Sequence, residues 1–170
     1  VPILINAPVR DGSLRGYAAE LGVPTLLYEV GEALRFYEVG IRAGIRGITN
    51  VMRKLGMLAS KKSSVSRIEP ATATSTSWVR APESGIIRFN AKLGERIKVG
   101  QLLATISDPF GEVAVPVAAP FGGIAIGRTN LPLAHEGDAL VNLASFKDVA
   151  LAEDRVETFA EVHDIDTSAV

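Results

Sequence analysis

An internal repeat constrains the fold of this 170-residue chain more than any other feature of its sequence. The stretch Ala81-Pro-Glu-Ser-Gly-Ile-Ile returns as Ala119-Pro-Phe-Gly-Gly-Ile-Ala, and Gly100-Gln-Leu-Leu-Ala-Thr-Ile returns as Gly137-Asp-Ala-Leu-Val-Asn-Leu. Each copy therefore has a turn, a strand, a loop, a glycine turn and a second strand. One copy is too small to bury its apolar residues alone, so the sequence predicts that the two pair with quasi-twofold symmetry in a flattened barrel or sandwich.

The rest of the chain divides around this repeat. Residues 1–60 alternate between strand and helix patterns, which predicts part of an α/β domain. Residues 61–77 are rich in Ser and Thr and predict a linker, residues 78–146 hold the repeat and predict an all-β domain, and residues 147–170 form an acidic tail. We expect the first half of this tail to be helical and its last residues to be frayed.

Four elements are expected within residues 1–60. The apolar run Ile3-Leu-Ile predicts a strand, Ser13 and Gly22 are typical of the two ends of a short helix, and residues 24–30 predict a second strand. A helix follows, because apolar residues recur at spacings of three and four from Leu34 to Leu55. We interpret this stripe as core and the arginines of the helix as a solvated face; its glycines permit the close approach of a neighbouring element.

Composition excludes several classes of function. The chain has no Cys and only two His, at positions 135 and 163, so it is poorly equipped to hold zinc by itself. Its formal net charge of −1 argues against a dedicated nucleic-acid binder. No apolar run is long enough for a membrane span, and no signal peptide is visible. We therefore expect a cytoplasmic protein that binds neither nucleic acid nor membrane. Because the chain opens directly on an apolar run without Met, we also expect a fragment.

The repeat resembles the biotinyl and lipoyl carrier domains, which consist of two quasi-symmetric halves. Those domains carry a modifiable Lys at the hairpin between the halves. Here that hairpin reads Ser107-Asp-Pro-Phe-Gly-Glu112, and no Lys occurs between Lys98 and Lys147. The resemblance therefore implies a biotinyl/lipoyl-like β-barrel, a barrel-sandwich hybrid, without the attachment chemistry of a carrier.

A second resemblance extends over residues 1–146. The motifs that carry it include Asp11-Gly-Ser-Leu-Arg, Gly22-Val-Pro-Thr-Leu-Leu-Tyr-Glu-Val-Gly, Gly47-Ile-Thr-Asn-Val-Met-Arg-Lys-Leu-Gly-Met-Leu and Gly127-Arg-Thr-Asn-Leu-Pro-Leu. In this order they are similar to the C-terminal half of the succinylglutamate desuccinylase/aspartoacylase family. These enzymes are zinc-dependent deacylases related to the zinc carboxypeptidases, which implies a partial zinc-carboxypeptidase-like α/β segment here.

This second resemblance implies roles for two residues. Glu29 ends the strand expected at residues 24–30, an edge where ligand crevices open in α/β sheets, and it would be the general base and acid beside a zinc-bound water. Arg15 would bind a substrate carboxylate, which the planar guanidinium fork suits. From the residues alone, two alternatives remain open: Glu29 could be a solvated residue at the end of a strand, and Arg15 could be a surface residue without a ligand. The His-x-x-Glu motif and the later His that hold zinc in the family are absent from this chain.

We therefore predict the C-terminal fragment of a zinc-dependent deacylase that cleaves the amide bond of N-acyl amino acids such as N-succinylglutamate or N-acetylaspartate. The zinc ligands would lie outside this chain, and the fragment alone would be inactive. The alternative is a non-catalytic binding or oligomerisation module with a lipoyl-like barrel. A homo-oligomer is possible under either prediction.

Overall fold

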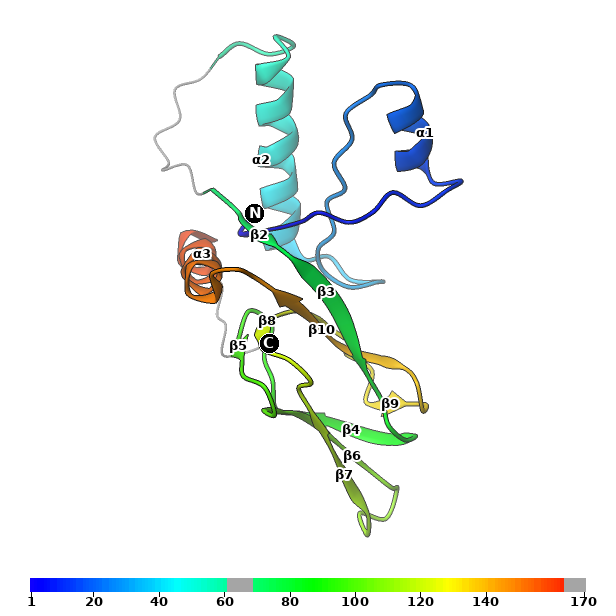
Figure 1. Ribbon diagram of the computed structural model, residues 1–170. Helices are drawn as coiled ribbons and strands as arrows, with labels where there is room; N and C mark the ends of the chain where they lie inside the picture. The colour runs from blue at the N-terminus through cyan, green and yellow to red at the C-terminus, as the bar shows by residue number, and fades with distance from the viewer. Residues whose placement is uncertain (61–68, 164–170) are drawn as a thin grey trace. The chain divides into compact units, whose positions relative to one another are not determined.

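The computed structural model describes residues 1–60 and 69–163. The chain forms two compact units. One comprises Ala7–Arg67, and the other joins Val1–Asn6 to Ile68–Val170. We call them the α unit and the β unit, and Figure 1 shows the elements of each. The sequence groups the first strand with residues 1–60, whereas the structure places this strand in the β unit.

Two four-stranded antiparallel sheets form the body of the β unit. The β10 sheet has the order β3-β10-β8-β5, with strands Ser75–Arg80, Ala139–Ser145, Gly123–Arg128 and Arg96–Ile97. The β6 sheet has the order β7-β6-β4-β9, with strands Ala114–Ala118, Leu102–Ser107, Gly85–Phe89 and Leu133–Ala134.

The strand order confirms the quasi-twofold pairing of the repeat. In sequence, β3, β4, β5 and β6 correspond to β7, β8, β9 and β10. Exchanging each strand for its counterpart converts the β10 sheet into the β6 sheet, in the same order. Each sheet therefore takes two strands from each copy, so that neither copy forms a sheet by itself.

The β-barrel that the resemblance implies is not closed. Among the described strands, none of the β10 sheet is paired with one of the β6 sheet, so of the two arrangements predicted from the repeat, a flattened barrel or a sandwich, the chain forms the sandwich. They share one apolar core, whose most deeply buried large side chains include Leu103, Ile106, Leu140 and Leu143. Each such side chain stabilises the fold by about 1.5–3 kcal/mol.

Matching turns precede the last strand of each copy. The backbone N–H of Lys98 donates to Gln101 Oε1 at 3.0 Å, and that of His135 donates to Asp138 Oδ2 at 2.8 Å. Between these partners the chain turns at Gly100 and Gly137, whose φ angles of 78° and 86° favour glycine. Gln101 and Asp138 are thus different residue types at equivalent positions of the two copies, and both accept the hydrogen bond that closes the turn.

One outer face of the sandwich is covered. Helix α3 (Val149–His163) and the parallel pair β1 (Ile3–Ile5) and β2 (Ala71–Ala73) cover the β10 sheet, where Ala71, Ile124 and Ala152 are buried together. The strand expected at Ile3 and the helix expected in the tail are both confirmed. Residues 164–170 and the start of the expected linker lie outside the described residues.

The rest of the expected linker differs in the structure. Residues 71–73 and 75–80 form strands, although the sequence assigns residues up to 77 to the linker. Ala71 and Ala73 are buried while Thr72 between them is exposed. This alternation suits a strand with one covered face, and it is too short to stand out in a Ser/Thr-rich sequence.

Two helices form the α unit. Helix α1 (Leu14–Glu20) begins after Ser13, whose hydroxyl accepts from the Gly16 N–H at 3.0 Å, so the short helix is confirmed. Helix α2 spans Glu38–Lys54. It begins later than the expected helix because Leu34 has a φ of 65°, which a right-handed helix excludes.

Two further expectations for the α unit are wrong. Residues 24–30 form no strand, because no described strand pairs with them, and a central strand needs hydrogen-bonding neighbours. The apolar stripe of α2 is also not core here, since Ile45, Ile48 and Leu55 are 60%, 64% and 68% exposed. Within the described residues, no helix combines the length and apolarity needed to span a bilayer.

The repeat supplies a matched pair of residues for a stability prediction. Ile124 on β8 and its counterpart Ile86 on β4 both point outward, but Ile124 is fully buried under α3 and Ile86 is 43% exposed. Ile124→Ala should therefore lower the free energy of unfolding by about 2–4 kcal/mol, and Ile86→Ala by roughly 1 kcal/mol or less. Urea titration followed by circular dichroism measures both, and equal losses would contradict the arrangement.

Candidate functional site

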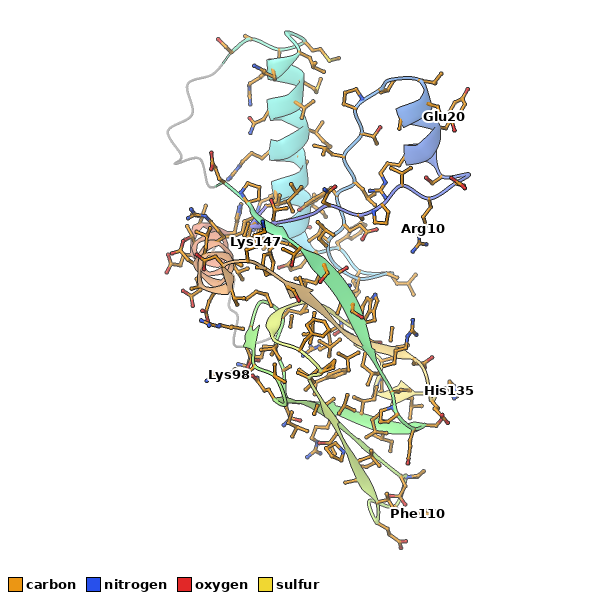
Figure 2. The ribbon with its side chains drawn as sticks, in the orientation of Figure 1. Arg10, Glu20, Lys98, Phe110, His135 and Lys147 are labelled. Atoms are coloured by element: carbon orange, nitrogen blue, oxygen red, sulfur yellow. The ribbon has the colours of Figure 1, made fainter. Side chains whose placement is uncertain are left out.

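Both predicted site residues lie in the α unit. Arg15 is in α1, and its Nη2 donates to the Pro8 carbonyl oxygen at 3.0 Å. The same loop is held by the Ser13 hydroxyl, which donates to the Arg10 carbonyl at 2.6 Å. Arg15 is partly buried, and a guanidinium has five N–H donors, so this contact leaves donors for a ligand. Figure 2 labels Arg10, in the loop before α1, and Glu20, the last residue of α1.

Glu29 lies between two residues that contact α2. The Tyr28 hydroxyl donates to the Gly40 carbonyl oxygen at 3.0 Å. A Cβ added at Gly40 would lie 2.7 Å from Val30 Cγ1, and one added at Gly44 would lie 3.0 Å from Tyr28 Cε1. Glu29 itself is exposed, so its carboxylate is available to solvent and solutes.

These contacts confirm that glycines of α2 permit a close approach. Any side chain at Gly40 would overlap Val30, and one at Gly44 would press on the Tyr28 ring. The third glycine, Gly47, has no atom within 4 Å of an added Cβ, so the expectation applies to two of the three positions. The approaching element is a segment without regular structure rather than the expected strand.

The structure does not join the two predicted residues. Among the hydrogen bonds and ion pairs of the described residues, none connects Arg15 to Glu29. Tyr28, by contrast, was not predicted from the sequence as part of the site. Its signal was the combination of a Tyr-x-Val segment and glycines four residues apart on the following helix.

A cavity of about 320 Å³ lies on the α2 side of the Glu29 segment. Its walls are mainly aliphatic and aromatic, and Glu29 is not among the residues that line it. The lining residues are Tyr28, Val30, Arg35, Phe36, Tyr37, Gly40, Ile41, Gly44, Ile45 and Ile48. The cavity therefore adjoins the segment but does not receive its carboxylate.

The described residues do not suit a zinc ion. No group of three or more His, Cys, Asp or Glu side chains comes together in residues 1–60 and 69–163. His135 is exposed at the turn between β9 and β10, as Figure 2 shows, and the His163 ring lies 4.4 Å from that of Phe159 in α3. Because the two histidines belong to separate elements and Cys is absent, zinc would need ligands from elsewhere.

Comparison with solved structures shows which fold the chain shares. A succinylglutamate desuccinylase from Silicibacter sp. TM1040 has a TM-score of 0.72 at 20% identity, over 84% of this chain and 44% of that one. The product-bound ectoine utilization protein EutE (DoeB) from Ruegeria pomeroyi has 0.73 at 21%, over 85% and 45%. A succinylglutamate desuccinylase/aspartoacylase from Rhodobacter sphaeroides has 0.71 at 20%, over 86% and 46%.

These structures share the mixed α/β and antiparallel-sheet architecture of the chain. The chain spans less than half the length of each of them. No protein-family model and no curated protein matches the sequence.

The Tyr28 contacts lead to a pH prediction. Burial, and secondarily the charge of Tyr37, raises the pKa of Tyr28 above its ordinary value of 10.0. The folded state therefore holds this proton more tightly than the unfolded state, and its contribution to stability is complete below about pH 10 and is lost as pH rises through the higher folded pKa. The test is a pH titration of tyrosinate absorbance in the wild-type protein and in the Tyr28→Phe variant. The difference between the two curves should have its midpoint above pH 10, and a midpoint at or below pH 10 would contradict the burial of Tyr28.

Proposed function

We propose that this chain is part of a zinc-dependent deacylase that hydrolyses the amide bond of N-acyl amino acids. The observation that carries the proposal is the exposed Glu29, which sits on a segment anchored to α2 within a fold shared with succinylglutamate desuccinylases and aspartoacylases. The structurally similar proteins indicate the class of reaction, and Glu29 and Arg15 are the groups that could perform it.

Glu29 would act as the general base and general acid. Its carboxylate would take a proton from the water that attacks the amide carbonyl and would then deliver that proton to the leaving amine nitrogen. A carboxylate can play both parts because its two oxygens accept and return a proton without rearranging the backbone. Its exposure in the structure leaves room for both the water and the amide.

Arg15 would bind the carboxylate of the amino acid or acyl group. Its Nη2 is bonded to the Pro8 carbonyl, which restrains the guanidinium while other N–H groups stay free to donate. Two parallel N–H···O bonds from a restrained guanidinium are stronger and more directional than a contact from Lys.

Zinc, when bound in the complete protein, would polarise the amide carbonyl and acidify the attacking water. Because the described residues form no zinc site, we assign its ligands to polypeptide outside this chain and derive no step through the metal. We also propose a cytoplasmic location for the complete enzyme.

We further propose that the sandwich has the biotinyl/lipoyl-like arrangement without carrier activity. The support is the exchange symmetry of its two sheets and the position of the β6–β7 hairpin, whose tip carries Phe110, as Figure 2 shows. Phe110 is 85% exposed and offers no amine for acylation. The sandwich would instead shape substrate access in the complete enzyme.

One observation favours a second candidate function. The exposed apolar stripe of α2 suits association with another polypeptide, which a non-catalytic binding or oligomerisation module would require. Under the deacylase proposal the same stripe would instead be covered by the remainder of the enzyme.

Substitutions in the complete enzyme test the roles of the two residues. Glu29→Gln should lower kcat by about 10²- to 10⁴-fold, because the side-chain amide of Gln cannot accept the proton of the attacking water. Arg15→Lys should raise KM about tenfold with a smaller change in kcat, because the bidentate contact is lost. Glu20→Gln and Arg46→Lys, both exposed, are the matched controls. Amine release from a panel of N-acyl amino acids measures the rates; full activity of Glu29→Gln would rule out its assigned role.

The 170-residue chain alone should be inactive, with or without added zinc, because it lacks a metal site among its described residues. Adding the remaining half of the enzyme, together with analytical ultracentrifugation of the same sample, distinguishes the two candidate functions. If the chain is part of a deacylase, it should gain activity when the remaining half of the enzyme is added. If the chain forms a stable self-associated species and gains no activity, the result favours the non-catalytic module. Zinc-dependent amide hydrolysis by the purified chain would overturn this prediction.

A further inference from the structure

We infer that Tyr28 is the positioning residue for Glu29, and that Gly40 and Gly44 form the notch on α2 that receives it. The inference rests on the proposed function for the role of Glu29, but the anchoring itself is independent of any reaction. It follows from the contacts that residues 28 and 30 make with the first two turns of α2.

The hydroxyl contact depends on a glycine carbonyl. A backbone carbonyl has two lone pairs, so Gly40 can accept from Tyr28 in addition to a helical N–H. The absence of a side chain at Gly40 lets Val30 approach the backbone there, since an added Cβ would lie 2.7 and 2.8 Å from its two methyl carbons. Gly40 is also the one buried residue of α2, whereas Tyr28 and Val30 keep 42% and 50% of their surface exposed.

The ring contact depends on the second glycine. An added Cβ at Gly44 would lie 3.0 Å from Tyr28 Cε1 and 3.4 Å from Cδ1, so the ring lies directly against the helix at that turn. Hydroxyl and ring thus fix Tyr28 along the helix at two positions, while Val30 fixes the other side of Glu29. A carboxylate between two anchored neighbours has far fewer positions than one on a free loop, which reduces the entropy lost in reaching a reactive geometry.

The absence of Cys from the chain allows a direct test of this anchoring. Glu29→Cys creates a single attachment point for a nitroxide spin label, whose electron paramagnetic resonance spectrum separates immobile from mobile populations. In the full 170-residue chain, Tyr28→Phe should raise the mobile population about fivefold, the factor expected for losing one hydrogen bond. Gly44→Ala should produce a similar rise by displacing the ring.

Two matched controls isolate the contact. Tyr17→Phe removes a hydroxyl from an exposed tyrosine of the same unit, and Gly47→Ala adds a methyl group to α2 where an added Cβ meets nothing within 4 Å. Neither should change the spectrum, although Gly47→Ala gains the same helix propensity as Gly44→Ala. Circular dichroism checks that α2 keeps its helicity in each variant. Unchanged mobility in Tyr28→Phe and Gly44→Ala, or equal changes in the controls, would overturn the inference.

Kinetics of the complete enzyme then separate positioning from general stability. Tyr28→Phe should lower kcat about tenfold and leave KM within about twofold, and it should cause no further loss in a Glu29→Gln background, because both changes act through one carboxylate. Label mobility that depends on Tyr28 in an enzyme without deacylase activity would refute the proposed function and leave the anchoring intact. An active enzyme that needs Glu29 but is indifferent to Tyr28→Phe would refute the inference and leave the function.

Discussion

The exchange of strands between the two repeat copies is the constraint on which the β unit depends. Each sheet takes two strands from each copy, so the shared core exists only when both copies are folded together. The buried side chains come in repeat-related pairs: Leu103 matches Leu140, and Ile106 matches Leu143. A core built this way is all-or-none, because one copy alone would expose the apolar side of every strand.

The outer faces break this symmetry. Ile124 and Ile86 are equivalent in the repeat, yet α3 and the β1–β2 pair cover only the first. The Arg96 guanidinium of β5 also forms an ion pair with Glu153 of α3 at 3.2 Å. Because the two side chains of this pair are partly exposed, at 46% and 35%, the pair adds little to stability, and the apolar contacts of Ile124, Ala152 and Val156 hold the helix. The repeat therefore specifies the sandwich, and the segments flanking it specify which face is covered.

The difference between what the sequence predicted and what it missed follows from where each element finds its partners. The cap at Ser13 and the repeat pairing were predictable, because their partners are local or internally repeated. The strand at Ile3 was predictable from its apolar run, although its partner β2 lies far along the chain. The strand expected at residues 24–30 failed because periodicity reports which side chains can be buried, and not whether a neighbouring strand is present to accept hydrogen bonds. The late start of α2 was also hidden, since nothing in the spacing of Leu34 announces a left-handed backbone.

The same reasoning explains why the candidate site was only half predictable. Residue type and motif pointed to Glu29 and Arg15, but a motif carries no information about what holds a side chain in place. The Glu29 segment is held by a tertiary contact between Tyr28 and the glycines of α2. This contact is possible because Gly40 and Gly44 have no side chains. A segment without strand pairing still has a defined position here, because one hydroxyl bond and one close ring contact replace the ladder it lacks. The α unit thus keeps the geometry around Glu29 by local contacts even though its apolar stripe stays exposed.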